Sequence, residues 1–156
     1  MLQKELLDMM KADQDMRKSG KYNPEISMKL TKRLKELIRE NGWPTYDLVG
    51  EKAAFAAWLI VQHSDKDKSF QKKCLKLLTE AVEKGQASKK NLAYLCDRVK
   101  VNYGRKQLYG TQFFVNSKGE YAPRPIEDME NLEKRRKEFG LEPFADYKKY
   151  MEDRHK

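Results

Sequence analysis

The longest apolar stretch of the chain is Ala53 to Val61, nine consecutive apolar residues that read AAFAAWLIV. A helix built from such a stretch has no polar side, so the rest of the fold must cover it all round. Gln62, His63 and Asp65 follow the stretch directly. We therefore predict a buried central helix over Glu51 to His63 that brings polar groups to its C-terminal end.

Apolar residues elsewhere recur at the three- and four-residue spacing of amphipathic helices. The spacing predicts helices over Leu2 to Lys18, from Pro24 to a stop at Gly42, from a cap at Asp65 or Asp67 to an end before Gly85, and from a cap at Ser88 to Tyr103. Polar residues with short side chains precede the last three of these helices and can accept hydrogen bonds from their first N–H groups. The caps that we expect are Asn23, Asp65 or Asp67, and Ser88.

After Gly104 the pattern changes from helical to alternating. Lys106 to Val115 is rich in aromatic and β-branched residues, which predicts a strand, and Glu120 to Ala122 predicts a short return strand. A sixth helix is predicted to open at Pro125, and a last short one to cover Pro143 to Arg154. The sequence thus predicts a mainly α fold: one domain, residues 1–156, with six or seven helices in a compact bundle around the central helix and one β-hairpin.

The composition indicates a globular protein with a highly charged surface. The chain has 156 residues, of which 37% are charged and 39% hydrophobic, and its mean hydropathy is −0.92. No apolar run is long enough to cross a bilayer, and MLQKELLDMM lacks the basic and apolar regions of a signal peptide. We expect a cytoplasmic protein without a membrane partner, in which Cys74 and Cys96 are packed, reduced thiols; a disulfide between them stays open.

The net charge of +9 makes nucleic acid a candidate partner. Basic residues are mixed with acidic ones almost everywhere, as in KRLKELIRE, and such mixing is typical of a solvated helix face. A nucleic-acid partner is therefore the less favoured interpretation. The sequence says nothing about the oligomeric state.

Several charged residues fall where apolar ones are expected. Asp13 and Arg17, one helical turn apart, lie near the apolar stripe of the first helix. They form either an ion pair at the edge of the core or part of a polar pocket. Asp97 and Arg98 lie on a helix with apolar residues on two sides, so we expect them to be buried or half-buried.

The sequence resembles a bacterial family of uncharacterised proteins, and the resemblance covers nearly the whole chain. The stretches that carry it are DQDMR (13–17), GWPTYDLVG (42–50), AAWLIVQHSD (56–65), FQKKCL (70–75), LAYLCDRV (92–99), QLYGTQF (107–113), PRPIED (123–128) and RRKEFGLEPFADY (135–147). Ser64 stands where the family usually has alanine. The resemblance implies no particular reaction. The polar positions that match the family pattern are Asp13, Gln14, Arg17, Gln62, His63, Asp65, Gln71, Asp97, Arg98, Gln107, Tyr109, Thr111 and Gln112.

No cofactor or metal is expected from the sequence. With one histidine apart from His155 near the C-terminus, a zinc site with several histidine ligands is excluded. Asp65 and Asp67 lack the glycine and the closing glutamate of a calcium loop. There is no glycine-rich phosphate loop, and Thr111, Tyr109 and Ser64 are weak nucleophile candidates because no signature surrounds them.

The leading hypothesis is a single polar pocket that binds a small polar or anionic ligand resembling a nucleotide, a sugar or an amino acid. In this hypothesis His63 acts as an acid or base of hydrolase or transferase chemistry and Asp97 fixes its tautomer. The residues expected to bind the ligand are Asp13, Gln14, Arg17, Gln62, Arg98, Tyr109, Thr111 and Gln112. Whether the protein is an enzyme stays open. The alternatives are a basic module that binds nucleic acid or protein without catalysis, and a polar core that has no ligand.

Overall fold

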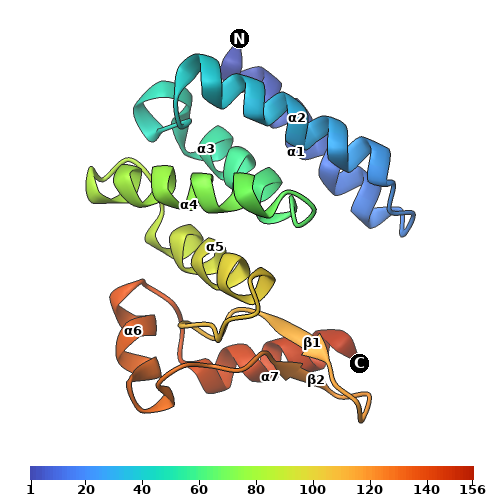
Figure 1. Ribbon diagram of the computed structural model, residues 1–156, viewed down its shortest axis with the longest axis vertical. Coiled ribbons are helices and arrows are strands. Elements are labelled where there is room, and N and C mark those ends of the chain that lie inside the picture. The colour runs from blue at the N-terminus through green and yellow to red at the C-terminus, as the bar shows by residue number, and fades with distance from the viewer. The chain divides into compact units, whose positions relative to one another are not determined.

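The computed structural model describes all residues, 1–156, and confirms the mainly α prediction (Figure 1). Seven α-helices and one two-stranded antiparallel hairpin make up the fold. The helices are α1 (Leu2–Lys18), α2 (Pro24–Asn41), α3 (Tyr46–Gln62), α4 (Lys68–Glu83), α5 (Lys89–Asn102), α6 (Leu132–Glu138) and α7 (Phe144–His155). The strands are β1 (Phe113–Val115) and β2 (Tyr121–Pro123). The chain divides into two compact units, residues 1–91 (unit 1) and 92–156 (unit 2); that they form a single domain stays a prediction.

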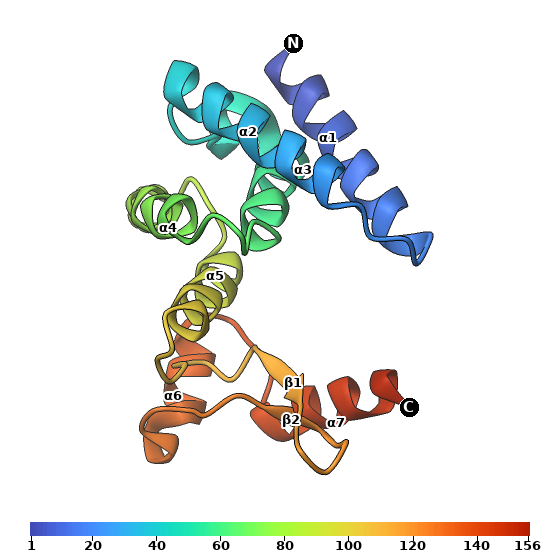
Figure 2. The same cartoon turned by 45° about the vertical axis from the view of Figure 1, so that its right-hand side comes forward.

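Helix α3 is the centre of unit 1. It packs against α1, α2 and α4, and Figures 1 and 2 show α1 and α2 running antiparallel beside each other with α3 next to them. Nine of its residues are buried, among them Ala53, Ala57 and Val61, which are fully inaccessible. The buried central helix predicted from the apolar stretch is therefore confirmed.

The start of α3 differs from the prediction. The helix begins at Tyr46 rather than at Glu51, with the Thr45 hydroxyl accepting a hydrogen bond from Leu48 N, and it is broken at Gly50 (φ 81°, ψ 164°). A left-handed φ of this kind is accessible to glycine at little cost. Tyr46 to Val49, which lie between the predicted helices, thus form one extra helical turn set at an angle to the main helix.

The expected helix ends of unit 1 agree with the structure. The Asn23 side chain accepts hydrogen bonds from Glu25 N and Ile26 N, and α2 ends at Gly42. Asp67, rather than Asp65, caps α4 through Phe70 N. Ser88 accepts a hydrogen bond from Asn91 N at the start of α5.

Unit 2 contains a shorter hairpin than predicted. β1 pairs with β2 over three residues, with Phe114 opposite Ala122, and α7 packs against β2. The predicted strand over Lys106 to Val115 was wrong for its first seven residues, which form a loop around the side chain of Asp97. Alternation of residue types could not distinguish this loop from a strand.

The last two helices also differ from their predicted bounds. The predicted opening at Pro125 was wrong, because a 3₁₀ turn at Met129–Asn131 precedes α6, which begins at Leu132. Helix α7 includes His155, whose ring stacks on Tyr121 with centroids 4.6 Å apart. No helix of the structure combines the length and apolarity that a bilayer crossing requires.

Candidate functional site

Three side chains of unit 1 form a hydrogen-bonded chain, Arg17–Asp13–His63. The Asp13 carboxylate is 2% exposed, and its Oδ2 lies 2.7 Å from Nδ1 of His63. Arg17 Nε donates to both oxygens of the same carboxylate, at 3.2 and 3.3 Å. The ion pair that the sequence suggested within the first helix therefore exists, and its carboxylate also holds a histidine from the end of α3.

The sequence places Asp13 at this point because it lies on the apolar stripe of α1. Leu6, Met9, Asp13 and Met16 are the buried residues of that helix, at helical spacing. A carboxylate carried into the core on such a stripe needs hydrogen-bonding partners, since an unpaired buried charge is very unfavourable. His63 and Arg17 are those partners.

The Asp13 carboxylate determines which nitrogen of the neutral His63 ring carries the proton. Burial by itself raises the pKa of Asp13, but the hydrogen bonds and positive charges of His63 and Arg17 outweigh it and hold that pKa below its usual value. An ionised carboxylate only accepts hydrogen bonds, so the ring nitrogen facing it, Nδ1, carries a proton. In the neutral ring Nε2 is then unprotonated, and it makes no hydrogen bond within the protein.

Buried polar side chains hold the end of α3 in place. Gln71, fully inaccessible on α4, donates to the carbonyls of Val61 and Gln62 and to Oδ1 of Asp65. The hydroxyls of Ser64 and Thr31 lie 2.8 Å apart and connect α2 to the turn after His63. The ring of His63 is therefore presented by a segment that is fixed from two neighbouring helices.

His63 lines a groove with a volume of about 1060 Å³, which we call the basic groove. Helix α2, the turn after α3 and the start of α4 form most of it. Its lining residues are Arg17, Tyr22, Ser27, Met28, Thr31, Lys32, Lys35, Glu36, Ile38, Arg39, His63, Ser64, Asp65, Lys66, Asp67, Ser69, Phe70 and Lys73. A volume of this size accommodates a small-molecule ligand.

Three of the lysines in the basic groove have no acidic partner. Lys35 pairs with Asp67 at 2.8 Å, and Arg17 is held by Asp13, whereas Lys32, Lys66 and Lys73 form no ion pair. Sequence reasoning missed these three residues because isolated lysines on helices and turns look like ordinary solvated surface. Only the fold shows that they line the same groove as His63.

The predicted site residues of unit 2 form a separate polar network, centred on Asp97. Its carboxylate is fully inaccessible and accepts hydrogen bonds from the backbone N–H groups of Leu108, Tyr109 and Thr111 and from the Thr111 hydroxyl. The four donors favour the ionised carboxylate and lower its pKa, but the effect of burial is larger, so the pKa of Asp97 is raised. Asp97 thus acts as the anchor of the loop before β1.

The other polar residues of that loop are also engaged within unit 2. Gln112 accepts from Arg98 Nη1 at 2.9 Å and donates to the Thr111 hydroxyl at 3.0 Å. The carbonyl of Tyr109 accepts from Arg136, a fully buried arginine, at 2.6 Å. The side-chain amide of Gln107 donates from Nε2 to the carbonyl of Gln112 and accepts at Oε1 from the backbone N–H of Gln112. These contacts explain why polar residues are buried in the segment that was predicted to be a strand.

The predicted site residues therefore fall in both units. Arg17 and His63 line the basic groove and Asp13 supports them. Gln14 is half-buried and Gln62 is buried, and neither lines the groove. Asp97, Arg98, Tyr109, Thr111 and Gln112 belong to unit 2. A common pocket of the two sets, with Asp97 as the partner of His63, stays a prediction; the carboxylate that the structure sets against His63 is Asp13.

Neither cysteine is placed to act as a nucleophile. Both are free thiols, and burial raises the pKa of Cys74 to about 12 and that of Cys96 to about 11, so the reactive thiolate is scarce at neutral pH. The structure contains no group of three or more histidine, cysteine, aspartate or glutamate side chains placed to hold a metal ion.

The comparison with family models assigns the chain to a protein family. Residues 1–156 match the model of a family of unknown function (DUF6624), and the chain belongs to this family. No curated protein and no solved structure matches it. The resemblance to an uncharacterised family is thereby confirmed, whereas a bacterial origin stays a prediction.

Proposed function

We propose that this member of the family of unknown function DUF6624 binds a small anionic molecule in the basic groove and uses His63 as an acid or base on it. The observation that carries the proposal is the Arg17–Asp13–His63 chain: a buried carboxylate holds Nδ1 of a half-buried histidine whose ring lines the groove. Such a carboxylate fixes the tautomer and orientation of the imidazole.

The charge of the groove supports an anionic ligand. Lys32, Lys66 and Lys73 line it without acidic partners, so their ammonium groups can donate hydrogen bonds to phosphate or carboxylate oxygens. Arg17 lines the same groove, and its side chain is 36% exposed. Ligands of the nucleotide, sugar-phosphate or amino-acid type carry the groups that these cations recognise.

The chemistry follows from the orientation of His63. With Nδ1–H directed to Asp13, Nε2 can accept a proton from a hydroxyl or a water molecule held in the groove. The imidazolium that forms is stabilised by the Asp13 carboxylate 2.7 Å from Nδ1. His63 can then return the proton to a leaving group, which is the pattern of hydrolysis or group transfer.

A thermal-shift panel of matched anionic and neutral compounds tests the binding proposal. We expect nucleotides or sugar phosphates to raise the unfolding temperature, and their nucleosides or free sugars to leave it unchanged, because a ligand that binds only the folded state stabilises it. Replacing Lys32, Lys66 and Lys73 together by glutamine should abolish the shift. The control is the same replacement at Lys29, Lys76 and Lys84, which lie on the same helices or at their ends but outside the groove.

The result separates this proposal from the two alternatives. Equal loss of binding in both triple variants would indicate a response to net charge alone. Binding that grows with the length of an oligonucleotide and falls steeply with salt would favour a nucleic-acid module. No shift with any compound would leave the Arg17–Asp13–His63 chain as a structural ion pair, the role that the polar network of unit 2 has around Asp97.

A further inference from the structure

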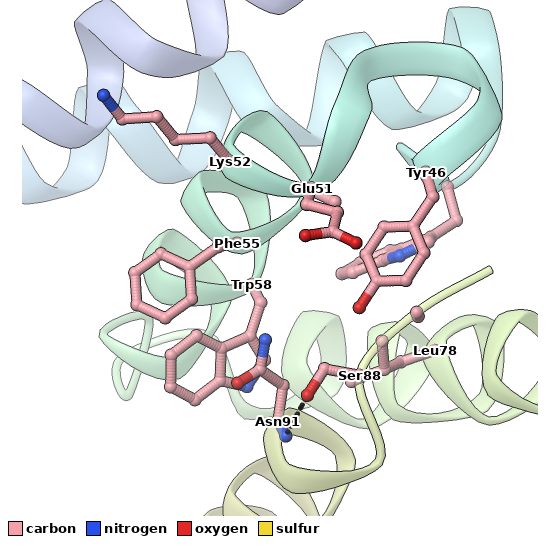
Figure 3. Close-up of a pocket in the computed structure, with 11 residues that line it drawn as sticks. Tyr46, Glu51, Lys52, Phe55, Trp58, Leu78, Ser88 and Asn91 are labelled. Atoms are coloured by element: carbon pink, nitrogen blue, oxygen red, sulfur yellow. Dashed lines mark hydrogen bonds between the residues drawn. The ribbon is translucent and has the colours of Figure 1, made fainter. Parts of the chain in front are cut away.

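Unit 1 contains a second cavity, of about 490 Å³, whose walls include four aromatic side chains (Figure 3). Trp43, Tyr46, Phe55 and Trp58 line it, together with the carboxylate-bearing Glu51. Phe55 and Trp58 lie against each other with ring centroids 5.2 Å apart. Phe55 is 39% exposed although it belongs to the apolar stretch of α3, and its ring lines the cavity.

The break at Gly50 creates this arrangement. It turns the first helical turn of α3 away from the main helix, so that Tyr46 comes from one side and Phe55 and Trp58 from the other. Figure 3 shows the Glu51 carboxylate between them, beside the Tyr46 ring. Glu51 makes no hydrogen bond or ion pair. The pKa of Tyr46 is raised, mainly because the phenol is partly buried and secondly because of the negative charge of Glu51.

Lys52 does not neutralise that carboxylate. Lys52 lines the cavity, but Figure 3 shows its ammonium extending away from Glu51 and from the aromatic rings. It forms no salt bridge with any acidic residue. The cavity therefore combines aromatic faces, which carry partial negative charge, with the solvent-exposed carboxylate of Glu51, which no cation of the protein pairs with.

We propose that this aromatic cavity binds a small organic cation of the trimethylammonium class. Aromatic faces attract a cation within about 6 Å, and a quaternary ammonium fits between several of them because it needs no hydrogen-bond acceptor. Glu51 supplies the counter-charge, and the hydroxyl and amide of Ser88 and Asn91 at the edge of the cavity suit a polar substituent of the ligand. The site is independent of the basic groove, since the two share no lining residue.

Choline is the probe, and the protein reports its own binding. The chain has two tryptophans, Trp43 and Trp58, and both line the cavity, so intrinsic tryptophan fluorescence follows this site directly. The matched ligand is 3,3-dimethyl-1-butanol, which has the shape of choline without its charge. Titrations use sodium chloride to hold ionic strength and chloride constant.

We expect a saturable fluorescence change with choline and an affinity for the neutral alcohol at least about tenfold weaker. Glu51→Gln should weaken choline binding by about tenfold and leave binding of the alcohol unchanged. Glu25→Gln, an equal change of charge at an exposed position outside the cavity, should leave both unchanged.

Two further variants keep the result specific. Phe55→Leu should reduce choline binding although the side chain stays apolar, and the triple lysine variant of the basic groove should bind choline normally. Equal affinity for choline and the neutral alcohol, or no saturable change with choline in the folded wild-type protein, would overturn the proposal. Neither result would bear on the anionic ligand of the basic groove.

Discussion

Replacing Asp13 by asparagine tests whether the buried carboxylate holds His63. Asparagine keeps the shape of the side chain but has one acceptor oxygen and one NH₂ group, and no charge. A hydrogen bond to a charged group contributes about 1.5–3 kcal/mol, and the neutral bond that remains about 1 kcal/mol. The pair with Arg17, whose side chain is 36% exposed, adds only about 0.5 kcal/mol. We therefore expect a loss of about 1–2.5 kcal/mol in the free energy of unfolding.

Urea unfolding followed by tryptophan fluorescence measures this loss in unit 1, because Trp43 and Trp58 are both buried there. Asp15→Asn is the matched control in the same helix. Asp15 pairs with Lys11 across one turn but its side chain is 59% exposed, so its replacement should cost less than about 0.5 kcal/mol. Equal stabilities of the two variants would refute the role given to Asp13.

Three further outcomes follow from the structure. Because the folded pKa of Asp13 lies below its unfolded value, its contribution to stability is complete above about pH 5 and is lost as the pH falls through the folded pKa. The stability gap between wild type and Asp13→Asn, measured by urea unfolding, should therefore narrow progressively as the pH falls below about 4. Asp97→Asn removes acceptors for buried donors and should cost about 3 kcal/mol, with hydrogen exchange at Leu108, Tyr109 and Thr111 faster than in wild type; unchanged protection would contradict the anchoring role. Gly50→Ala places a side chain at a left-handed φ of 81°, where it meets no steric clash but strains the backbone, and should lower the free energy of unfolding by about 1–2 kcal/mol. A urea unfolding midpoint equal to that of the wild type would contradict the break in α3 at Gly50.

The helices could be predicted from the sequence because their signals are local. The apolar stretch of α3, the Asn23 cap and the Gly42 stop depend on neighbouring residues alone, and the structure agrees with each. The loop before β1 has the residue types of a strand, and only Asp97, which lies on another element, makes it a loop. Contacts at long range in the sequence cannot be seen in local patterns.

The candidate site shows the same limit. Asp13 and Arg17 stood out as charges on or near an apolar stripe, and His63 as a polar residue at the end of a core helix. That these two features meet depends on the packing of α1 against α3, fifty residues apart. The lysines of the basic groove gave no local signal, because a lysine on a solvated helix face and one beside a ligand groove occupy the same kind of position in the sequence.

Nitrogen-15 NMR of the histidine rings tests the central claim most directly, with His155 as an internal reference. In the free protein Nδ1 of His63 should carry a proton and Nε2 should be an acceptor in the neutral ring, whereas Asp13→Asn should alter this tautomer. Titration with AMP at constant ionic strength should shift the His63 nitrogens saturably and leave those of His155 in place. A His63 ring protonated at Nε2 instead of Nδ1, or one that does not respond to AMP or inorganic phosphate, would contradict the account.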